Sequence, residues 1–279
     1  RVGLRLQNRD PLNLRLDEKQ AAAALGQIRL AEAYADSFAE RDLNVGQILL
    51  TQEDTENRRR YLNARATLNR LLDWGTVPLV NENDTVATAE IRFGDNDRLA
   101  ARVGGMVGAD LLVLLSDIDG LYTSNPKASA AAKHLPLVTS GITPEIEAMA
   151  GDETSAYAKG GMVTKLAAAK IALGAGCAMV IADGRVLNPL QTLVDGARAT
   201  LFTSTETRHS AREAWLLGAL SGDGALILDD GAARAVQAGK SLLPAGVVRV
   251  EGAFERGDTV SITRADGTDI GRGIAAYGS

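Results

Sequence analysis

Apolar and polar positions alternate along the chain in blocks of two kinds. Stretches rich in Ala, Leu and charged residues predict helices, because these residue types have high helix propensity. Short, continuous apolar runs between them predict strands. The predicted helices are 18–41, 56–72, 97–107, 144–150 and 160–173, and the predicted strands are 45–50, 77–80, 111–115 and 177–182. Strands that alternate with helices favour a layered α/β fold with a largely parallel sheet.

Three local details refine these elements. Asp17 followed by Gln20 fits a capping box at the start of the first helix. Thr143 before Pro144 fits an N-cap and the first helical position. The run 111–115 is continuously apolar, which is typical of a strand buried on both faces.

The pattern changes after residue 202. Residues 203–213 are largely polar and predict a linker. Beyond it, a turn signal at 265–267 and four short apolar runs predict strands at 225–228, 247–250, 259–263 and 269–277. We therefore expect an α/β domain over 1–202 and a small β-rich domain over 214–279.

Composition narrows the class of protein. With 279 residues, 46% apolar and 23% charged, the chain fits a globular protein rather than a disordered one. The net charge of −5 disfavours a duplex nucleic-acid binder, and 4% aromatic residues disfavour binding of single strands by stacking. No apolar run approaches the ~20 residues of a membrane span, and no signal peptide is visible, so we expect a cytoplasmic location.

Cysteine and histidine usage argues against a metal held by these side chains. The single cysteine, Cys177, cannot form an intrachain disulfide or a cysteine-based zinc site. His134 and His209 lie far apart in the sequence and match no metal-ligand spacing. We expect both imidazoles to titrate in solvent and no protein-held metal.

The stretch 81–97 concentrates polar side chains beside a predicted strand end. It contains five carboxylates and three amides, among them Asn81, Asp84, Asn96 and Asp97. One interpretation is a solvated loop. A functional loop is the other, because connections of about 15 residues within a compact domain are uncommon unless they are functional or disordered. Such a cluster could hold an ammonium group, a metal ion or a catalytic lysine.

Two further segments carry candidate chemistry. Ser116-Asp117 ends the strand 111–115, where α/β sheets bind ligands, although a plain turn explains it equally well. The segment 159–165 begins a helix with Gly160-Gly161, which lets backbone N–H groups approach a phosphate, and adds Thr164 and Lys165. It is not a Walker loop, and Gly239-Lys240-Ser241 fails that pattern because Arg234 occupies the first glycine position.

These motifs occur in an order and spacing found in a known family. The chain resembles the glutamate 5-kinase family of the amino-acid kinase superfamily through Asn81-Glu82-Asn83-Asp84, Gly94-Asp95-Asn96-Asp97, Ser116-Asp117 and Gly160-Gly161-Met162-x-Thr164-Lys165. The likeness covers essentially the whole chain, and the tail, with its segment 241–246, is similar to a PUA domain. The implied fold is a layered αβα kinase sheet followed by a small β-rich domain.

The resemblance implies an activity and a set of roles. The activity is transfer of the ATP γ-phosphate to the side-chain carboxylate of L-glutamate, the first step of proline biosynthesis and usually inhibited by proline. L-glutamate would contact Asp84 and Asn96, with Asn81 close by. Lys165 would neutralise charge on the phosphoryl group, and Asp97 would hold the catalytic lysines in place. ATP would contact Ser116, Asp117, Lys159, Gly160, Gly161, Met162, Val163, Thr164 and Lys165.

The resemblance also implies Mg²⁺ bound with ATP and a homo-oligomer, either a dimer or a tetramer. The sequence departs from the family in two ways. Two opening motifs, a strand with a Lys and a glycine turn and then a Ser-Ser-Gly-Ala strand, are not in it, and we expect them before Arg1. Lys159 stands where the family commonly has Thr, and Ala158 stands where it has Gly. These two residues can keep the backbone contacts to ATP, but Lys159 cannot make the contact of the Thr hydroxyl.

Two alternatives stay open at this point. One is a sister kinase that acts on acetylglutamate, aspartate, carbamate or UMP. The other is a catalytically inactive relative with a regulatory or RNA-binding role. From Ala214 onward the tail has eight acidic and six basic residues, and this balance of −2 disfavours tight RNA binding. We therefore expect no nucleic-acid or membrane partner.

Overall fold

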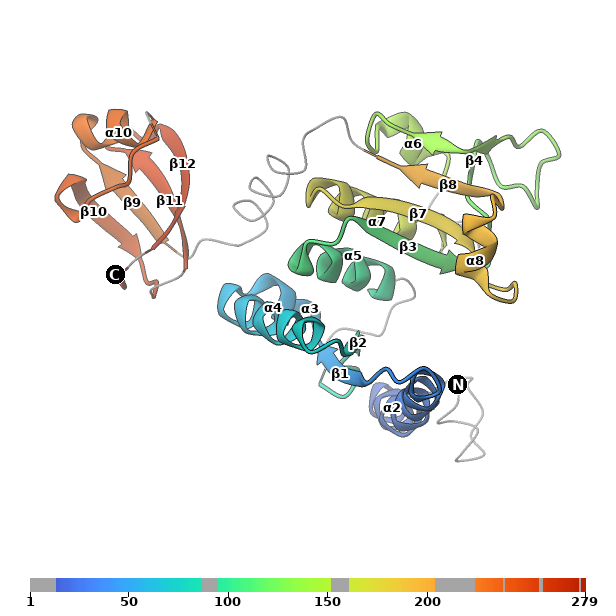
Figure 1. Ribbon diagram of the computed structural model, residues 1–279. Coiled ribbons are helices and arrows are strands. Elements are labelled where there is room, and N and C mark those ends of the chain that lie inside the picture. Colours follow the sequence, from blue (N-terminus) through green and yellow to red (C-terminus); the bar gives the residue numbers. More distant parts are fainter. Residues whose placement is uncertain are drawn as a thin grey trace. The chain divides into compact units, whose positions relative to one another are not determined.

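The chain divides into two units in the computed structural model, which describes residues 14–86, 95–151, 161–203 and 224–279 apart from 238, 256–257 and 276. The first unit is Arg1–Gln52 with Arg65–Arg212, and the second is Glu53–Ala64 with Glu213–Ser279. The elements of each can be followed in Figure 1. Apart from residue 203, the expected linker 203–213 lies outside the described residues.

Two sheets and a short hairpin form the β-structure of the first unit (Figure 1). The strands are β1 (Val45–Leu50), β2 (Val77–Glu82), β3 (Leu111–Ser116), β4 (Leu121–Tyr122), β5 (His134–Leu135), β6 (Leu137–Val138), β7 (Ala178–Asp183) and β8 (Ala199–Phe202). β1 and β2 form a parallel pair, and the larger sheet has the order β3-β7-β8-β6. In it, β3 runs parallel to β7 and β6 parallel to β8, whereas β7 and β8 are antiparallel. β4 and β5 pair as the hairpin.

The helices between residues 16 and 194 largely match the sequence pattern, and their residues within Glu53–Ala64 belong to the second unit. They are α2 (Leu16–Ala39), α3 (Gln52–Glu56), α4 (Arg58–Asp73), α5 (Asp95–Val107), α6 (Pro144–Ala148), α7 (Met162–Gly174) and α8 (Pro189–Val194). The predicted cap of α6 is confirmed, because the Thr143 side chain accepts a hydrogen bond from the Ile146 N–H. The capping box at Asp17 is wrong. α2 begins at Leu16, two residues before the predicted start, and the Glu18 carboxylate accepts from the N–H of the N-cap residue Arg15.

A hydrophobic core lies between α5, α6, α7 and the larger sheet. α5 packs along α7 and also contacts β2 and β3. Small, fully buried side chains dominate the core near these two helices, including Ala101, Ala168, Ala169 and Ala172, and they allow the backbones to approach closely. The thiol of Cys177 is buried in the same cluster. In the described part of the chain, no helix is long and apolar enough to cross a membrane.

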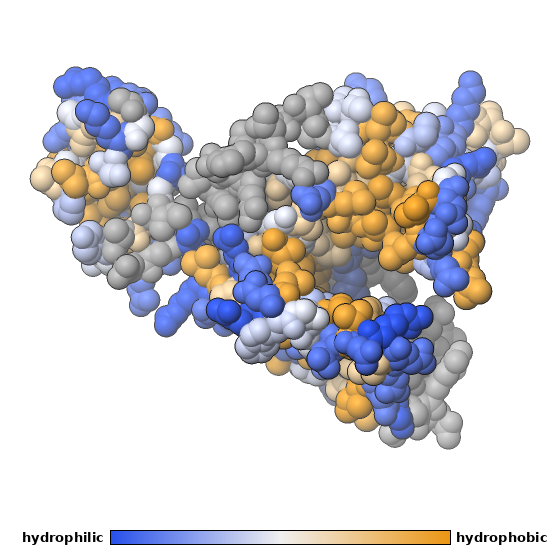
Figure 2. Space-filling model, in the orientation of Figure 1, coloured by the Kyte–Doolittle hydropathy of each residue, from blue (hydrophilic) through white to orange (hydrophobic). Residues whose placement is uncertain are grey.

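β3 is not buried on both faces, contrary to its apolar sequence. Leu111 and Leu115 are 47% and 45% exposed, whereas Leu112 and Leu114 pack into the core. Successive side chains of a strand point to opposite faces, so only one of the two sets is covered here. Among the described residues, β3 pairs with β7 alone. Figure 2 shows further apolar surface on this unit, and α8 with its preceding loop contributes Leu187, Leu190 and Val194.

The second unit contains a small, four-stranded sheet, as the tail pattern predicted. Its elements are β9 (Gly224–Leu228), α10 (Asp230–Gln237), the short 3-10 helix η1 (Pro244–Gly246), β10 (Val247–Gly252), β11 (Thr259–Arg264) and β12 (Asp269–Ile274). The strand order is β10-β9-β11-β12, with β11 parallel to β9 and the other pairs antiparallel. Leu228, Ala233 and Ile262 form a core between α10 and this sheet.

Candidate active site

The carboxyl ends of β3 and β7 lie side by side and carry polar residues. Ser116 is in register with Asp183, and the Gly184 N–H donates to the Ser116 carbonyl oxygen at 2.7 Å. A Cβ at Gly184 would lie 2.9 Å from the Leu115 Cβ, so only glycine allows this close approach of the two strand ends. The Ser116 hydroxyl donates to the Asp117 carboxylate at 3.2 Å. Parallel strand ends are where open α/β sheets bind their ligands.

A second group of polar residues lies where α5 and α7 begin. The Lys165 Nζ atom lies 3.0 Å from Asp97 Oδ2, and the two side chains are only 11% and 21% exposed. The Thr164 hydroxyl is 3.3 Å from the same carboxylate oxygen and 2.9 Å from the Gly161 carbonyl oxygen. A part-buried ammonium with a fixed partner is held at a defined position and samples few other rotamers. The structure thus brings Asp97, Thr164 and Lys165 together.

The packing of α5 on α7 sets the geometry of this group. Asp97 lies in the first turn of α5, and Thr164 and Lys165 lie in the first turn of α7. Because the two helices pack along each other through small side chains, their amino ends are fixed relative to one another. Met162 is almost fully buried and anchors the start of α7. Lys159 and Gly160, which also belong to the predicted segment, lie outside the described residues.

The residues predicted to bind the acceptor are spread over β2, the segment after it and α5. The Asn81 amide donates to Gln27 Oε1 of α2 at 2.6 Å, a contact that no sequence pattern predicted. Burial raises the pKa of the Asp84 carboxyl above its usual value, because desolvation penalises the charged form. Asn96 is exposed in the first turn of α5.

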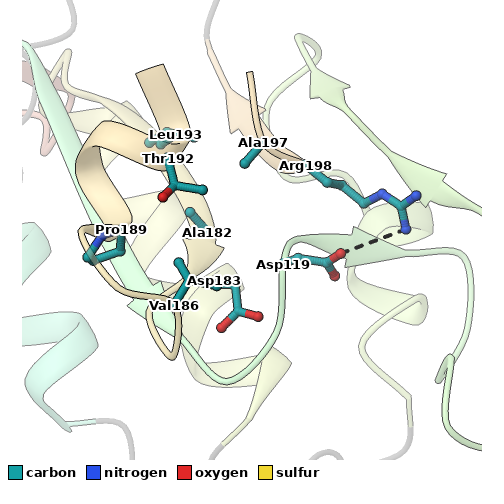
Figure 3. A pocket seen from close by; sticks show the side chains of 9 residues that line it. All are labelled: Asp119, Ala182, Asp183, Val186, Pro189, Thr192, Leu193, Ala197 and Arg198. Carbon is teal, nitrogen blue, oxygen red and sulfur yellow. Dashed lines mark ion pairs between the residues drawn. The ribbon is translucent and has the colours of Figure 1, made fainter. Parts of the chain in front are cut away.

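A pocket of about 190 Å³ borders the end of β7 (Figure 3). Its wall is mostly apolar and carries two carboxylates, Asp119 and Asp183, and one guanidinium. The pocket is lined by Asp119, Ala182, Asp183, Val186, Pro189, Thr192, Leu193, Ala197 and Arg198. Hydrogen bonds from Arg185 lower the pKa of Asp183 to about 2, so this carboxylate stays charged. Neither Asp183 nor Arg198 belongs to a motif that the sequence pattern singled out.

The turn after β3 is attached to β8 through side chains. The Tyr122 hydroxyl donates to Asp119 Oδ1 at 2.9 Å, and the Arg198 guanidinium lies 3.7 Å from Asp119 Oδ2, the ion pair drawn in Figure 3. His134 packs edge-on against the Tyr122 ring, with the ring centroids 5.2 Å apart. The expectation of a solvated His134 is wrong, because burial of the imidazole lowers its pKa. His209 lies outside the described residues.

Metal-binding clusters of three or more His, Cys, Asp or Glu residues do not occur in the part of the chain that the structure describes. The protein has an α/β fold with the residues of a phosphate-handling enzyme. These are carboxylates at strand ends and a fixed lysine at the amino end of a helix, and a separate β-rich tail follows them.

Comparisons with known proteins agree with this class. The model of the amino acid kinase family matches residues 4–183, and the PUA domain model matches residues 224–279. The chain belongs to the amino acid kinase family. It is 59% identical over 264 residues to a protein of Paramagnetospirillum magneticum named glutamate 5-kinase. The matched residues make up 95% of this chain and 71% of that protein. A Rhodospirillum rubrum protein of the same name is 55% identical over 278 residues, covering 100% of this chain and 74% of that one.

Solved structures with partial likeness include an aspartokinase and a PUA domain. Aspartokinase III of E. coli, in complex with aspartate and ADP, is 20% identical, with a TM-score of 0.48 over 70% of this chain and 43% of that chain. A PUA domain from Aeropyrum pernix is 40% identical over 20% of this chain and 32% of that chain, with a TM-score of 0.20.

Proposed function

We propose that this protein transfers the γ-phosphoryl group of ATP to the side-chain carboxylate of L-glutamate and forms glutamyl 5-phosphate, the first step of proline biosynthesis. One carboxylate oxygen of the acceptor attacks the γ-phosphorus, the bond to the β–γ bridging oxygen breaks, and ADP leaves. The relatives at 55% and 59% identity, both named glutamate 5-kinase, support the choice of acceptor. The observation that carries the chemistry is the Lys165 ammonium, held 3.0 Å from Asp97 at the amino end of α7.

Lys165 would stabilise the phosphoryl group during transfer. Phosphoryl transfer demands mainly positioning and neutralisation of charge from the protein. An ammonium about 4 Å from a phosphoryl oxygen contributes on the order of 4 kcal/mol at an effective dielectric near 20. The Asp97 carboxylate and the Thr164 hydroxyl restrict where the ammonium can lie. Asp97 therefore acts as a positioning residue for Lys165.

The donor would bind along Ser116, Asp117 and the segment 159–165. The amino end of α7 presents backbone N–H groups and the positive end of a helix dipole to phosphate oxygens. The pocket beside β7 suits another part of the donor. Its carboxylates, Asp119 and Asp183, repel phosphate, so the uncharged nucleoside fits its apolar wall better. Mg²⁺ would arrive with the ATP phosphates and offset their charge, and a carboxylate such as the exposed Asp117 suits this hard cation.

The acceptor would bind at Asp84, Asn96 and Asn81. The partly buried carboxylate of Asp84 gains from a cationic partner, and the ammonium group of glutamate supplies one. Inhibition by proline, assembly into a dimer or tetramer and a cytoplasmic location are the further properties that we expect of this function. We also propose that the acidic tail has a structural or regulatory role and does not bind RNA.

The proposal is tested with the purified full-length protein in an assay of ADP release. Glutamate, acetylglutamate, aspartate, carbamate and UMP are offered in turn with MgATP. We expect turnover with glutamate alone, and turnover of glutamate slower by about 10²–10³ in Lys165→Met. Faster turnover with another acceptor would assign the chain to a sister kinase. ATP binding without turnover of any acceptor would indicate a regulatory relative.

A further inference from the structure

β8 and the residue before it attach to the turn that follows β3 at two places. At the first, Asp119 accepts a hydrogen bond from the Tyr122 hydroxyl and forms an ion pair with Arg198. The Arg198 guanidinium also donates to the Tyr122 oxygen at 3.2 Å, so the three side chains form a closed cycle. Tyr122 is only 8% exposed, so the packing around its ring restricts the position of the hydroxyl.

The second attachment uses a buried threonine in β8. Thr200 is fully buried, and its hydroxyl oxygen accepts from the Leu121 N–H at 2.7 Å and donates to the Leu135 carbonyl at 2.6 Å. Gly120 has a φ of +147°, and a Cβ there would lie 2.5 Å from the Thr200 hydroxyl oxygen. The turn is thus pressed against β8 without space to shift toward it.

This turn connects directly to Ser116 and Asp117, the residues assigned above to the ATP donor. We propose that Tyr122 and Arg198 are positioning residues, which hold Asp119 and through it the 116–119 turn in the conformation that binds the nucleotide donor. The inference rests on the proposed function. Asp119 also lines the pocket beside β7, so the same cycle fixes one wall of the space next to the donor residues.

The exposure of these side chains separates positioning from general stability. The Arg198 side chain is 61% exposed and that of Asp119 is 31% exposed. An exposed ion pair contributes little to the free energy of unfolding, because solvent screens it. Loss of the Arg198 contacts therefore leaves the fold intact but frees the turn to sample other conformations. Each such conformation must be excluded again when the nucleotide binds, which weakens affinity.

The test measures ADP affinity by calorimetry, a readout that does not depend on the acceptor. The variants of the full-length protein are Tyr122→Phe, Arg198→Met, Arg198→Lys and the double variant Tyr122→Phe/Arg198→Met. Phe keeps the ring contact with His134. The matched control is Lys170→Met, which removes an exposed lysine and its ion pair with Glu147 in the same unit.

Each single variant should weaken ADP binding and raise the KM for ATP about three- to tenfold, as loss of one net hydrogen bond predicts. The double variant should lose less than the product of the two, because both act on Asp119. Arg198→Lys should recover part of the loss, and Lys170→Met should bind ADP like wild type. The KM for glutamate and the melting temperature should stay close to wild type in the single variants.

Two results would overturn the inference. One is ADP affinity within twofold of wild type in both Tyr122→Phe and Arg198→Met. The other is a parallel loss of ADP affinity, glutamate affinity and melting temperature, which indicates a purely structural cycle. If wild type binds ADP but does not phosphorylate glutamate, the proposed acceptor is wrong, and the ADP affinities still decide the role of Tyr122 and Arg198.

Discussion

Removal of the Lys165 ammonium is the most direct perturbation of the candidate site. Lys165→Met preserves most of the side-chain volume at the start of α7, and the Thr164 hydroxyl still lies 3.3 Å from the Asp97 carboxylate. Two unit charges at 3.0 Å interact with about 5 kcal/mol at an effective dielectric near 20, so Asp97 holds this ammonium firmly in the native protein. A lost preorganised donor of charge stabilisation costs about 2.7–4 kcal/mol in other enzymes.

We therefore expect kcat to fall by about 10²–10³ in Lys165→Met, with a smaller change in the KM for glutamate. The assay is ADP release at saturating ATP and glutamate. Lys170→Met, which changes an exposed lysine of the same helix, serves as the matched control and should keep its turnover. A kcat of Lys165→Met within tenfold of wild type would refute the assignment of Lys165 to the transferring phosphoryl group.

Three further predictions concern other residues of this unit. Asp84→Asn should raise the KM for glutamate with little effect on ATP. Because burial raises the pKa of Asp84 in the folded state, its charged form costs stability above pH 4, so the variant should resist urea better at pH 7 and equally at pH 3. Arg185→Met should raise the pKa of Asp183 from about 2 toward its usual value in a carboxyl NMR titration. The variant should also lack the stability that wild type has above pH 4 and loses as the pH falls through 2. Gly120→Ala should lower the free energy of unfolding by about 1–3 kcal/mol, because an alanine Cβ would collide with the Thr200 hydroxyl; an unchanged urea midpoint contradicts this.

The long elements of the fold could be predicted because their sequence pattern is regular. The strands β1 and β7 and the helices α5 and α7 begin and end within two residues of the predicted positions. The two-residue strands β4, β5 and β6 were missed, because a strand of that length shows no periodicity. The antiparallel pairing of β7 with β8 could not be predicted either, since the apolar pattern of a strand does not encode the direction of the neighbouring strand.

The candidate site was predictable where the residues form local motifs. Asp97 and the pair Thr164-Lys165 each belong to a short polar segment. Thr164 and Lys165 lie 67 and 68 residues after Asp97, and only the resemblance to a family indicated that the two segments share one site. Arg198 gave no signal, because it precedes an apolar strand and reaches Tyr122 only through the register of β8, 76 residues along the chain. Leu111 and Leu115 misled the prediction for β3, because side-chain hydrophobicity does not reveal whether a second layer covers the strand.

The Cys177 thiol can report local opening of the hydrophobic core. It is 1% exposed and belongs to the core cluster beside α5 and α7, and the sequence contains no second thiol to confuse the signal. Reaction with a thiol reagent requires that this core opens, because a buried thiol is inert. The labelling rate of the native protein thus measures the opening free energy of the layer that carries Asp97 and Lys165, and a bound nucleotide that closes this layer should slow it.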